Sequence, residues 1–279
     1  MKRIVTIQDF SCVGKCSLTS ALPVISATGV EACGIPTALL SNHTGFDTFY
    51  SRDLTEELIP IGHQLKTEKI DFDAIYTGYI ASIHQMELIS DFIEDFGEGA
   101  LIFVDPVMGD NGRIYSGLSS DYPEHIMKLC RKADILAPNV TEACLLLDRE
   151  YSRELSMDCI RDMLKELQSL CGGYVFITGV SSGNMLGAVG FDGHSFHERF
   201  NPREDIVIAG TGDILSAAFL GAVMRGAEYA KALDIAVDFT YEAVRQTVKA
   251  PDKRHYGVHF ELALPYLIKE IEGIQNGKD

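Results

Sequence analysis

Residues 74–105, AIYTGYIASIHQMELISDFIEDFGEGALIFVD, contain two short apolar runs on either side of an amphipathic segment. The runs 74–77 and 101–105 have the length and composition of buried strands. Between them, Ser82 and Gln85 form a capping-box pattern that predicts the start of a helix. The inward face of this helix is predicted from the spacing of Met86, Ile89 and Ile93. A strand, a helix and a second strand in this order predict a βαβ unit with parallel strands.

The same alternation extends in both directions along the chain. Ser17 precedes an apolar helical face that begins at Leu18, so Ser17 is the predicted N-cap of the first helix. Further strands are predicted at 3–7, 32–40, 135–137 and 174–178. Because these runs are almost continuously hydrophobic, the strands should form a parallel sheet that helices cover on both faces. We therefore expect a single domain over residues 1–279, a three-layer α/β/α sandwich with a mostly parallel central sheet.

The pattern changes after Thr178. Residues 186–191 and 195–200 flank Asp192-Gly193, a dipeptide that is favoured in two-residue hairpin turns. An antiparallel edge is therefore expected on the sheet. Beyond it, the periodicity predicts helices over 214–225, 230–248 and 262–274.

The composition of the chain limits its surroundings and its partners. With 279 residues, of which 46% are hydrophobic, it can bury one substantial core. Gln8 and Asp9 interrupt the first apolar run, and no stretch approaches the roughly 20 apolar residues that cross a bilayer. The seven cysteines include no Cys-x-x-Cys pair, and the net charge of −16 opposes binding to nucleic acid or anionic lipid. We expect a cytoplasmic protein that binds neither nucleic acid nor membrane.

The most informative motif is Gly-Thr-Gly-Asp at 210–213, directly before an apolar helix that starts at Ile214. Such a turn exposes backbone N–H groups at a helix N-terminus, where the helix dipole favours a phosphoryl group. A carboxylate on the same turn, Asp213, can accept the proton of an attacking hydroxyl. Ordinary helix starts use the same residue types, so the motif leaves a phosphoryl-transfer site and a plain N-cap both open.

Two other glycine motifs do not meet the requirements of nucleotide binding. Residues 14–17, GKCS, resemble the end of a P-loop, but Asp9 stands where that loop needs its first glycine. Gly210 and Gly212 lack the third glycine of a dinucleotide-binding turn, because Leu215 occupies its place. A P-loop and a dinucleotide fold are therefore disfavoured.

Acidic side chains follow two of the predicted core strands. Asp105 ends the strand 101–105, and Glu142 lies shortly after the strand 135–137. Ligands of open α/β sheets collect at the carboxyl ends of the strands. Magnesium takes one or two carboxylates and keeps several waters, so Asp105 and Glu142 are candidate ligands, directly or through water. Either residue alone could also be an ordinary loop carboxylate.

A polar cluster, SNHTGF at 41–46, follows the strand 32–40, and Thr77-Gly78-Tyr79 ends the next strand. Hydroxyl, amide and imidazole groups beside aromatic rings suit a flat polar ring better than an aliphatic metabolite. Loop composition alone could also explain the cluster. The residues thus indicate, without proving, a site for a heteroaromatic substrate.

Together and in this order, the motifs resemble those of the pyridoxal kinase branch of the ribokinase-like superfamily. They are SNHTG at 41–45, TGY at 77–79, DPVMGD at 105–110, Asn139-x-x-Glu142 and GTGD at 210–213. The last two mark the superfamily, and the first three in combination point to the vitamin B6 branch. The resemblance covers nearly the whole chain. It implies transfer of the γ-phosphoryl group of ATP to the 5′-hydroxymethyl group of pyridoxal, pyridoxamine or pyridoxine, with Mg²⁺, a monovalent cation (K⁺ or Na⁺) and a homodimer.

The resemblance also implies roles for the matching residues. Asp213 would be the general base, and the backbone of Gly210, Thr211 and Gly212 would form an anion hole. The vitamin ring would contact Asn42, His43, Thr44 and Tyr79. Asp9 and Ser11 are further candidate ring contacts, although their segment does not match the family pattern. Asn139, Glu142, Thr178, Thr211 and Gly212 would contact ATP, and Asp105 with Glu142 would hold hydrated Mg²⁺. The segment 249–258 is expected to contribute to the adenine pocket.

One segment departs from the family pattern, because Asp9-Phe10-Ser11 stands where many pyridoxal kinases have Ser-His-Val. A carboxylate at Asp9 would favour a protonated pyridine nitrogen through a charge-assisted hydrogen bond. Alternatively, Asp9 caps the turn before Gly14 and never meets the ligand. Two other functions remain open: a hydroxymethylpyrimidine kinase, although the usual Gly-Ser-Asp opening of those enzymes is missing, and a non-catalytic B6-binding protein on the same fold.

Overall fold

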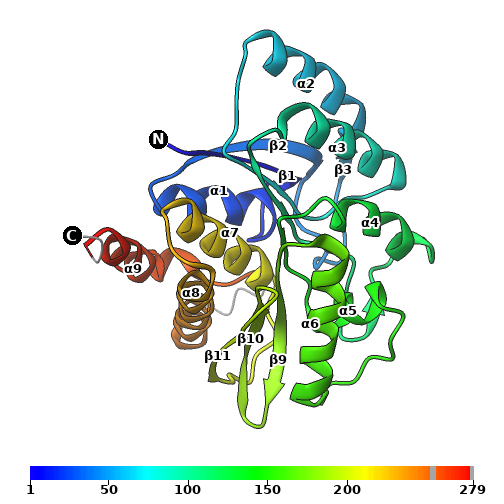
Figure 1. The fold of residues 1–279 in the computed structure, drawn as a ribbon. Coiled ribbons are helices and arrows are strands. Elements are labelled where there is room, and N and C mark those ends of the chain that lie inside the picture. The colour runs from blue at the N-terminus through cyan, green and yellow to red at the C-terminus, as the bar shows by residue number, and fades with distance from the viewer. Residues whose placement is uncertain (252–255, 277–279) are drawn as a thin grey trace. The chain divides into compact units, whose positions relative to one another are not determined.

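The computed structural model describes residues 1–251 and 256–276. The chain forms two compact units, each with its own strands and helices (Figure 1). The first unit combines Met1–Leu54 with Arg203–Asp279, and the second consists of Thr55–Pro202. The GTGD motif therefore folds together with the first strand, although about 200 residues separate them in the sequence.

The first unit pairs its strands in the order β1, β2, β3. β1 and β2 run parallel, from Arg3 opposite Glu31 to Ser11 opposite Leu40, and β3 is antiparallel to β2. Its elements are β1 (Arg3–Ser11), α1 (Leu18–Ala27), β2 (Glu31–Leu40), β3 (Ser51–Asp53), α7 (Thr211–Met224), α8 (Tyr229–Lys249), the 3₁₀ helix η2 (Phe260–Leu262) and α9 (Leu264–Asn276).

Strand β1 is longer than its predicted range of 3–7. Its pairing with β2 continues to Ser11 through a register shift, because Gln8 lies opposite Pro36 whereas Phe10 lies opposite Leu39. Asp9 sits at this irregularity, within the strand rather than after it as predicted. Bulges of this kind re-aim side chains and are common beside functional sites.

Helix α7 is apolar on every side, and residues 214–222 are all buried. A helix of this composition is stable only when neighbours cover it completely. α7 contacts α1 and α8, and α1 in turn contacts β1 and β2 (Figure 1). Because its neighbours enclose α7, its N-terminus, where the GTGD motif lies, has a fixed position relative to β1 and α1.

The second unit pairs its strands in the order β4, β5, β8, β9, β10, β11. Its elements are the 3₁₀ helix η1 (Thr55–Glu57), α2 (Leu58–Thr67), β4 (Ala74–Thr77), α3 (Ile83–Phe96), β5 (Leu101–Val104), β6 (Gly109–Asp110), β7 (Arg113–Ile114), α4 (Tyr122–Cys130), β8 (Ile135–Leu136), α5 (Val140–Leu146), α6 (Met157–Cys171), β9 (Tyr174–Ser182), β10 (Met185–Phe191) and β11 (Phe196–Pro202).

The strands of the second unit confirm the predicted change from parallel to antiparallel pairing. Parallel pairing joins β4 to β5, β5 to β8 and β8 to β9. Antiparallel pairing joins β9 to β10 and β10 to β11. At the hairpin turn, Asp192 Oδ1 accepts hydrogen bonds from the N–H groups of His194 and Ser195 at 2.8 and 2.7 Å. Gly193 next to it has a φ of 92°, which glycine adopts without strain.

Aromatic side chains fill the core of the second unit. Tyr76 and Phe103 meet edge to face with their ring centroids 5.0 Å apart, and Phe176 lies 6.2 Å from Phe103. These rings come from three parallel strands, β4, β5 and β9, as expected for strands that are buried on the sheet. The predicted mostly parallel α/β class with an antiparallel edge is confirmed. Over the described ranges, no helix has both the length and the apolar character to cross a membrane.

Candidate active site

The N-terminus of α7 is shaped by Gly210, which has a left-handed backbone with φ 83° and ψ 4°. A Cβ atom at this position would lie 1.9 Å from the carbonyl oxygen of Lys15, so both conformation and space require glycine. The helix begins at Thr211, and Asp213 lies in its first turn. The first N–H groups of a helix have no partner within it and can donate to an anion. The turn thus offers the donors that the motif predicts.

Asp213 is a carboxylate with a raised proton affinity. Part of the residue remains accessible to solvent, but its surroundings desolvate the carboxylate and raise the pKa of Asp213 from 3.8 to about 6. The backbone N–H of Ser17 donates to this carboxylate and lowers the pKa, whereas the nearby Asp9 raises it. A base with such a pKa can accept a proton and release it again near neutral pH.

Asp9 is a buried carboxylate close to Asp213, with 7% of the residue exposed. Its Oδ1 accepts a 2.6 Å hydrogen bond from the Ser17 hydroxyl, and its Oδ2 accepts a weaker one of 3.4 Å from Ser11. Burial raises the pKa of Asp9, whereas the two hydroxyl donors and His43 lower it. The structure therefore brings Asp9, Ser11 and Asp213 into one cluster, with Ser17 between the two carboxylates.

The Ser17 side chain does not cap α1, contrary to the prediction. Ser17 occupies the N-cap position and makes no side-chain cap hydrogen bond, because its hydroxyl donates to Asp9 instead. Its φ of 47° and ψ of −133° are unusual for a residue with a Cβ atom. A serine before an apolar helix normally caps it, so the sequence contains no signal for this second role.

The polar loop 41–46 uses much of its hydrogen-bonding capacity internally. The Asn42 amide donates to the Thr48 carbonyl oxygen at 2.8 Å, and its side-chain oxygen accepts from the Ser41 hydroxyl at 2.7 Å. The buried His43 ring accepts the Gly45 N–H at Nδ1, 2.9 Å away. Thr44 is exposed. Asn42 and His43 thus order the loop that presents Thr44.

The segment 256–261 is attached to this loop and to Lys15. With Nδ1 of His43 acting as an acceptor, Nε2 is left to donate to the Tyr256 carbonyl oxygen, 3.2 Å away. The Lys15 N–H donates to the same carbonyl at 3.0 Å, and Lys15 Nζ forms a 2.8 Å ion pair with Glu261. The Phe46 ring stacks on Tyr256 with centroids 5.6 Å apart. Residues distant in sequence therefore fix this segment against the turn at 14–17.

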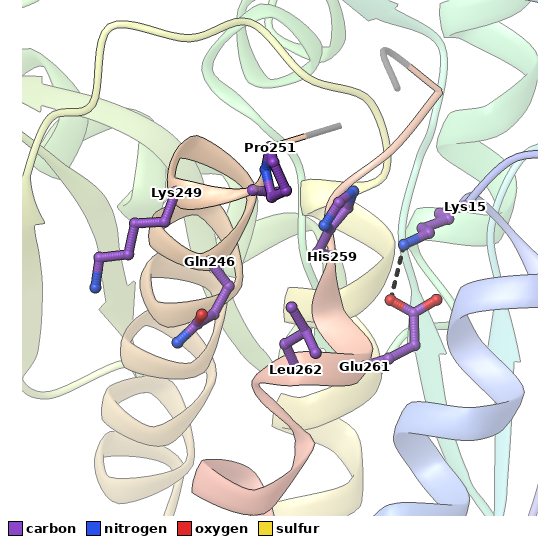
Figure 2. A pocket seen from close by; sticks show the side chains of 8 residues that line it. Lys15, Gln246, Lys249, Pro251, His259, Glu261 and Leu262 are labelled. Carbon is purple, nitrogen blue, oxygen red and sulfur yellow. Dashed lines mark hydrogen bonds and ion pairs between the residues drawn. The ribbon is translucent and has the colours of Figure 1, made fainter. Parts of the chain in front are cut away.

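A pocket of about 430 Å³ opens where the end of α8 faces η2, as Figure 2 shows. Lys15 and Glu261 form their ion pair on one side of it, and Gln246 of α8 lines the other. Its full lining is Lys15, Gln246, Lys249, Ala250, Pro251, His259, Glu261 and Leu262. The pocket includes the first residues of the segment 249–258 that was predicted to contact adenine; residues 252–255 of that segment lie outside the described residues.

The second unit contains a pair of buried carboxylates, Asp105 and Glu142, which are 7% and 2% exposed. Glu142 Oε1 accepts the Met108 N–H at 3.1 Å, and Oε2 accepts the Asn139 N–H at 2.8 Å. Burial, and then the charge of Asp105, raise the pKa of Glu142 well above its usual range. Two like charges at one buried place favour a bound cation.

These carboxylates fit a hydrated magnesium ion better than a fully protein-bound one. In the part of the chain that the structure describes, no group of three or more His, Cys, Asp or Glu side chains could hold a metal alone. Both Glu142 oxygens already accept backbone hydrogen bonds, so contact through water suits this residue. Magnesium commonly completes its shell with water and phosphate oxygens.

Asn139 and Thr178, predicted to contact ATP, lie side by side in a parallel β-bridge. Asn139 also forms a capping box with Glu142 at the start of α5, since its Oδ1 accepts the Glu142 N–H at 2.9 Å. Its Nδ2 donates to the Gly109 carbonyl oxygen at 2.9 Å. The Asn-x-x-Glu spacing matches the general capping-box pattern. The helix-capping role of Asn139 and Glu142 could therefore have been predicted from the sequence, but it was missed.

Tyr79 follows β4 and is half-buried. It lies near the buried Tyr122, whose hydroxyl donates to the Ile80 carbonyl oxygen at 2.8 Å. Burial, and to a smaller extent Tyr79, raise the pKa of Tyr122. Tyr122 therefore anchors the backbone beside Tyr79, which is itself partly exposed.

Comparison with solved structures identifies similar folds over almost the whole chain. A Bacteroides thetaiotaomicron protein with a provisional phosphomethylpyrimidine kinase name, solved in a form with pyridoxal, is 34% identical. The match covers 95% of this chain and 95% of that one, with a TM-score of 0.90. Pyridoxal kinase from Lactobacillus plantarum is 30% identical, with 96% and 97% of the two chains covered and a TM-score of 0.88. The predicted fold class and the resemblance to pyridoxal kinases are both confirmed.

Sequence relatives divide between vitamin B6 and thiamine enzymes. Pyridoxal kinase from Arabidopsis thaliana is 26% identical over 99% of this chain and 92% of its own length. The chloroplastic thiamine biosynthetic bifunctional enzyme TH1 of the same plant is 28% identical over 87% of this chain, which spans only 46% of that enzyme. Residues 18–259 match the phosphomethylpyrimidine kinase family model. The chain is therefore a kinase and belongs to the phosphomethylpyrimidine kinase family.

Proposed function

We propose that the chain transfers the γ-phosphoryl group of ATP to the 5′-hydroxymethyl group of a vitamin B6 vitamer, with Asp213 as the general base. The observation that carries this proposal is the position of Asp213 in the first turn of α7, beside the donors of the turn 210–212. A pKa of about 6 leaves its carboxylate mostly ionised at neutral pH and still basic enough to accept a proton.

In the proposed reaction, the vitamer hydroxyl oxygen attacks the γ-phosphorus while its proton moves to the Asp213 carboxylate. The bond from the γ-phosphorus to the bridging oxygen breaks, and ADP leaves with that electron pair. Negative charge on the transferring group is stabilised by the N–H groups of Thr211 and Gly212 and by the positive end of the α7 dipole. Catalysis here is positioning and electrostatics, as is general for phosphoryl transfer.

The second unit supplies the proposed metal and nucleotide contacts. Asp105 and Glu142 would hold hydrated Mg²⁺, which neutralises charge on the nucleotide phosphates when it is bound. Asn139 and Thr178 would contact ATP. The resemblance adds a monovalent cation, K⁺ or Na⁺, and places adenine along the segment 249–258.

The proposed contacts with the vitamin ring come from an acidic side chain, hydroxyl groups and an aromatic ring. The Asp9 carboxylate would receive a hydrogen bond from the protonated pyridine nitrogen, with Ser11 beside it. Thr44 would bind a ring substituent, and Asn42 and His43 would hold its loop in shape. Tyr79 would pack its face on the ring.

A hydroxymethylpyrimidine kinase is the second candidate, because the chain belongs to the phosphomethylpyrimidine kinase family and a thiamine biosynthetic enzyme is among its relatives. The two substrates share a hydroxymethyl group on a flat nitrogen heterocycle, so the same base and anion hole could serve either. Vitamin B6 is favoured because the Bacteroides relative has been solved with pyridoxal and the Lactobacillus relative is a pyridoxal kinase.

The test is an ATP-consumption assay with pyridoxal, pyridoxamine, pyridoxine and hydroxymethylpyrimidine under identical conditions. We expect the B6 vitamers to give the highest kcat/KM. Turnover restricted to hydroxymethylpyrimidine would select the second candidate. Saturable vitamer binding without any ATP consumption would indicate a non-catalytic B6-binding protein. A homodimer, which the resemblance implies, and a cytoplasmic location, which the composition favours, remain predictions; the first can be checked by light scattering.

A further inference from the structure

Ser17 has a backbone conformation that a residue with a Cβ atom rarely adopts, and it lies beside the Asp9 and Asp213 carboxylates. Its φ is 47°, in the region that favours glycine, and 7% of the residue is exposed. Residues held in sparsely populated conformations cluster at functional sites, because the surrounding structure has to impose them. Hydrogen bonds of Ser17 and of the chain before it impose this backbone conformation.

Each polar group of Ser17 has a different partner. The hydroxyl donates to Asp9 Oδ1 at 2.6 Å, and the backbone N–H lies close enough to the Asp213 carboxylate to lower its pKa. The backbone carbonyl accepts the N–H groups of Ser20 and Ala21 at 3.1 and 2.8 Å, which starts α1. The residue therefore connects the Asp9 carboxylate to the start of α1, whereas a simple N-cap serves the helix alone.

The chain before Ser17 is held in place independently. The Lys15 carbonyl oxygen faces Gly210 so closely that a Cβ atom there would lie 1.9 Å away. The Lys15 N–H donates to the Tyr256 carbonyl at 3.0 Å, and its side chain pairs with Glu261. The backbone around Ser17 is thus fixed against the α7 turn before any ligand binds, which is what a preorganised site requires.

We propose that Ser17 is a positioning residue that holds the Asp9 carboxylate in place beside Asp213, so that the ring contact and the general base act on one bound vitamer. The inference rests on the proposed function. The Ser17 hydroxyl orients Asp9 through its hydrogen bond to Oδ1. Since the N–H is present in every variant except proline, replacing the side chain tests the connection to Asp9 alone.

The test compares three substitutions at this position by steady-state kinetics. Ser17→Gly permits the positive φ but lacks the hydroxyl, and Ser17→Ala lacks the hydroxyl while retaining a Cβ atom. Ser17→Asn tolerates positive φ and restores a donor through its side-chain amide. We expect Ser17→Gly and Ser17→Ala to raise the vitamer KM roughly tenfold, the effect of one hydrogen bond to a charged group. The ATP KM should not change, and Ser17→Asn should recover at least part of the loss.

Ser20→Ala is the matched control, because Ser20 is a fully buried serine in the first turn of α1 whose hydroxyl has no hydrogen-bond partner among the described residues. It should leave both KM values unchanged. A Ser17→Gly variant with Asp9→Asn should be no worse than Asp9→Asn alone, because the hydroxyl acts through that carboxylate. If the wild type phosphorylates a vitamer, either of two results would overturn the inference. One is a vitamer KM in Ser17→Gly and Ser17→Ala equal to that of wild type, and the other is additive losses in the double variant. A wild type that phosphorylates no B6 vitamer would instead refute the proposed function, and the inference would fall with it.

Discussion

Replacing Asp213 with asparagine should remove turnover and stabilise the protein at the same time. The substitution keeps the size of the side chain and an oxygen that can accept the Ser17 N–H, but it removes the charge. Because folding raises the pKa of Asp213 from 3.8 to about 6, ionising this group costs stability in the folded state. A catalytic base that lowers the stability of the folded protein is expected where function requires that base.

The size and the pH window of the effect follow from that shift. Roughly two pKa units correspond to about 3 kcal/mol of unfolding free energy, an upper value because part of the residue is solvent-accessible. Wild type loses this stability as pH rises from about 4 to about 6, and Asp213→Asn does not. The variant should therefore be the more stable protein at pH 8 and equal to wild type near pH 3.5. Its turnover should fall by about 10²-fold or more.

The change in stability is measured by urea unfolding at pH 8 and at the lowest pH where wild type remains folded. The change in turnover is measured by steady-state kinetics. Asp91→Asn is the matched control, since Asp91 is exposed on α3, and it should change neither quantity. The kcat/KM of wild type should fall below pH 6 as Asp213 takes up a proton. A folded Asp213→Asn variant with near-normal turnover, or one that is less stable than wild type at pH 8, would refute the reasoning.

Three further substitutions test the other proposed contacts. Tyr79→Ala should raise the pyridoxal KM far more than the ATP KM, because a ring contact contributes on the order of 1 kcal/mol beyond burial; equal effects on both KM values would place Tyr79 in the core. Asp9→Asn should raise the KM of pyridoxal and pyridoxamine roughly tenfold and leave the ATP KM unchanged; lower thermal stability with unchanged KM values would assign Asp9 to the fold alone. Glu142→Gln should raise the Mg²⁺ concentration for half-maximal rate roughly tenfold, as expected when one of two carboxylates near the ion is lost; an unchanged Mg²⁺ dependence would exclude Glu142 from the metal site.

The parts of the fold that were predictable are those with local causes. The apolar runs at 74–77 and 101–105 become β4 and β5, and the Asp192-Gly193 turn joins β10 to β11, because composition and turn chemistry act over a few residues. The helix that follows the GTGD motif was predicted as well, but from Ile214, whereas α7 begins three residues earlier at Thr211, inside the motif.

The parts that were not predictable depend on contacts between distant segments. The positive φ of Ser17 requires the fold to bring together Asp9, Asp213 and Lys15, and no local pattern encodes that approach. The extension of β1 to Ser11 depends on a register shift against β2, which only the partner strand reveals. His43 was predicted as a ring contact because imidazole suits a polar ligand; in the structure both ring nitrogens are engaged within the first unit.

Phosphorus-31 NMR of the products from pyridoxal, ATP and Mg²⁺ tests the central claim most directly. We expect a new phosphate monoester signal whose phosphorus couples to the 5′-methylene protons and which grows in step with ADP, about 10²-fold more slowly with Asp213→Asn. ADP formation without that monoester, or a monoester formed from hydroxymethylpyrimidine and not from pyridoxal, would contradict it.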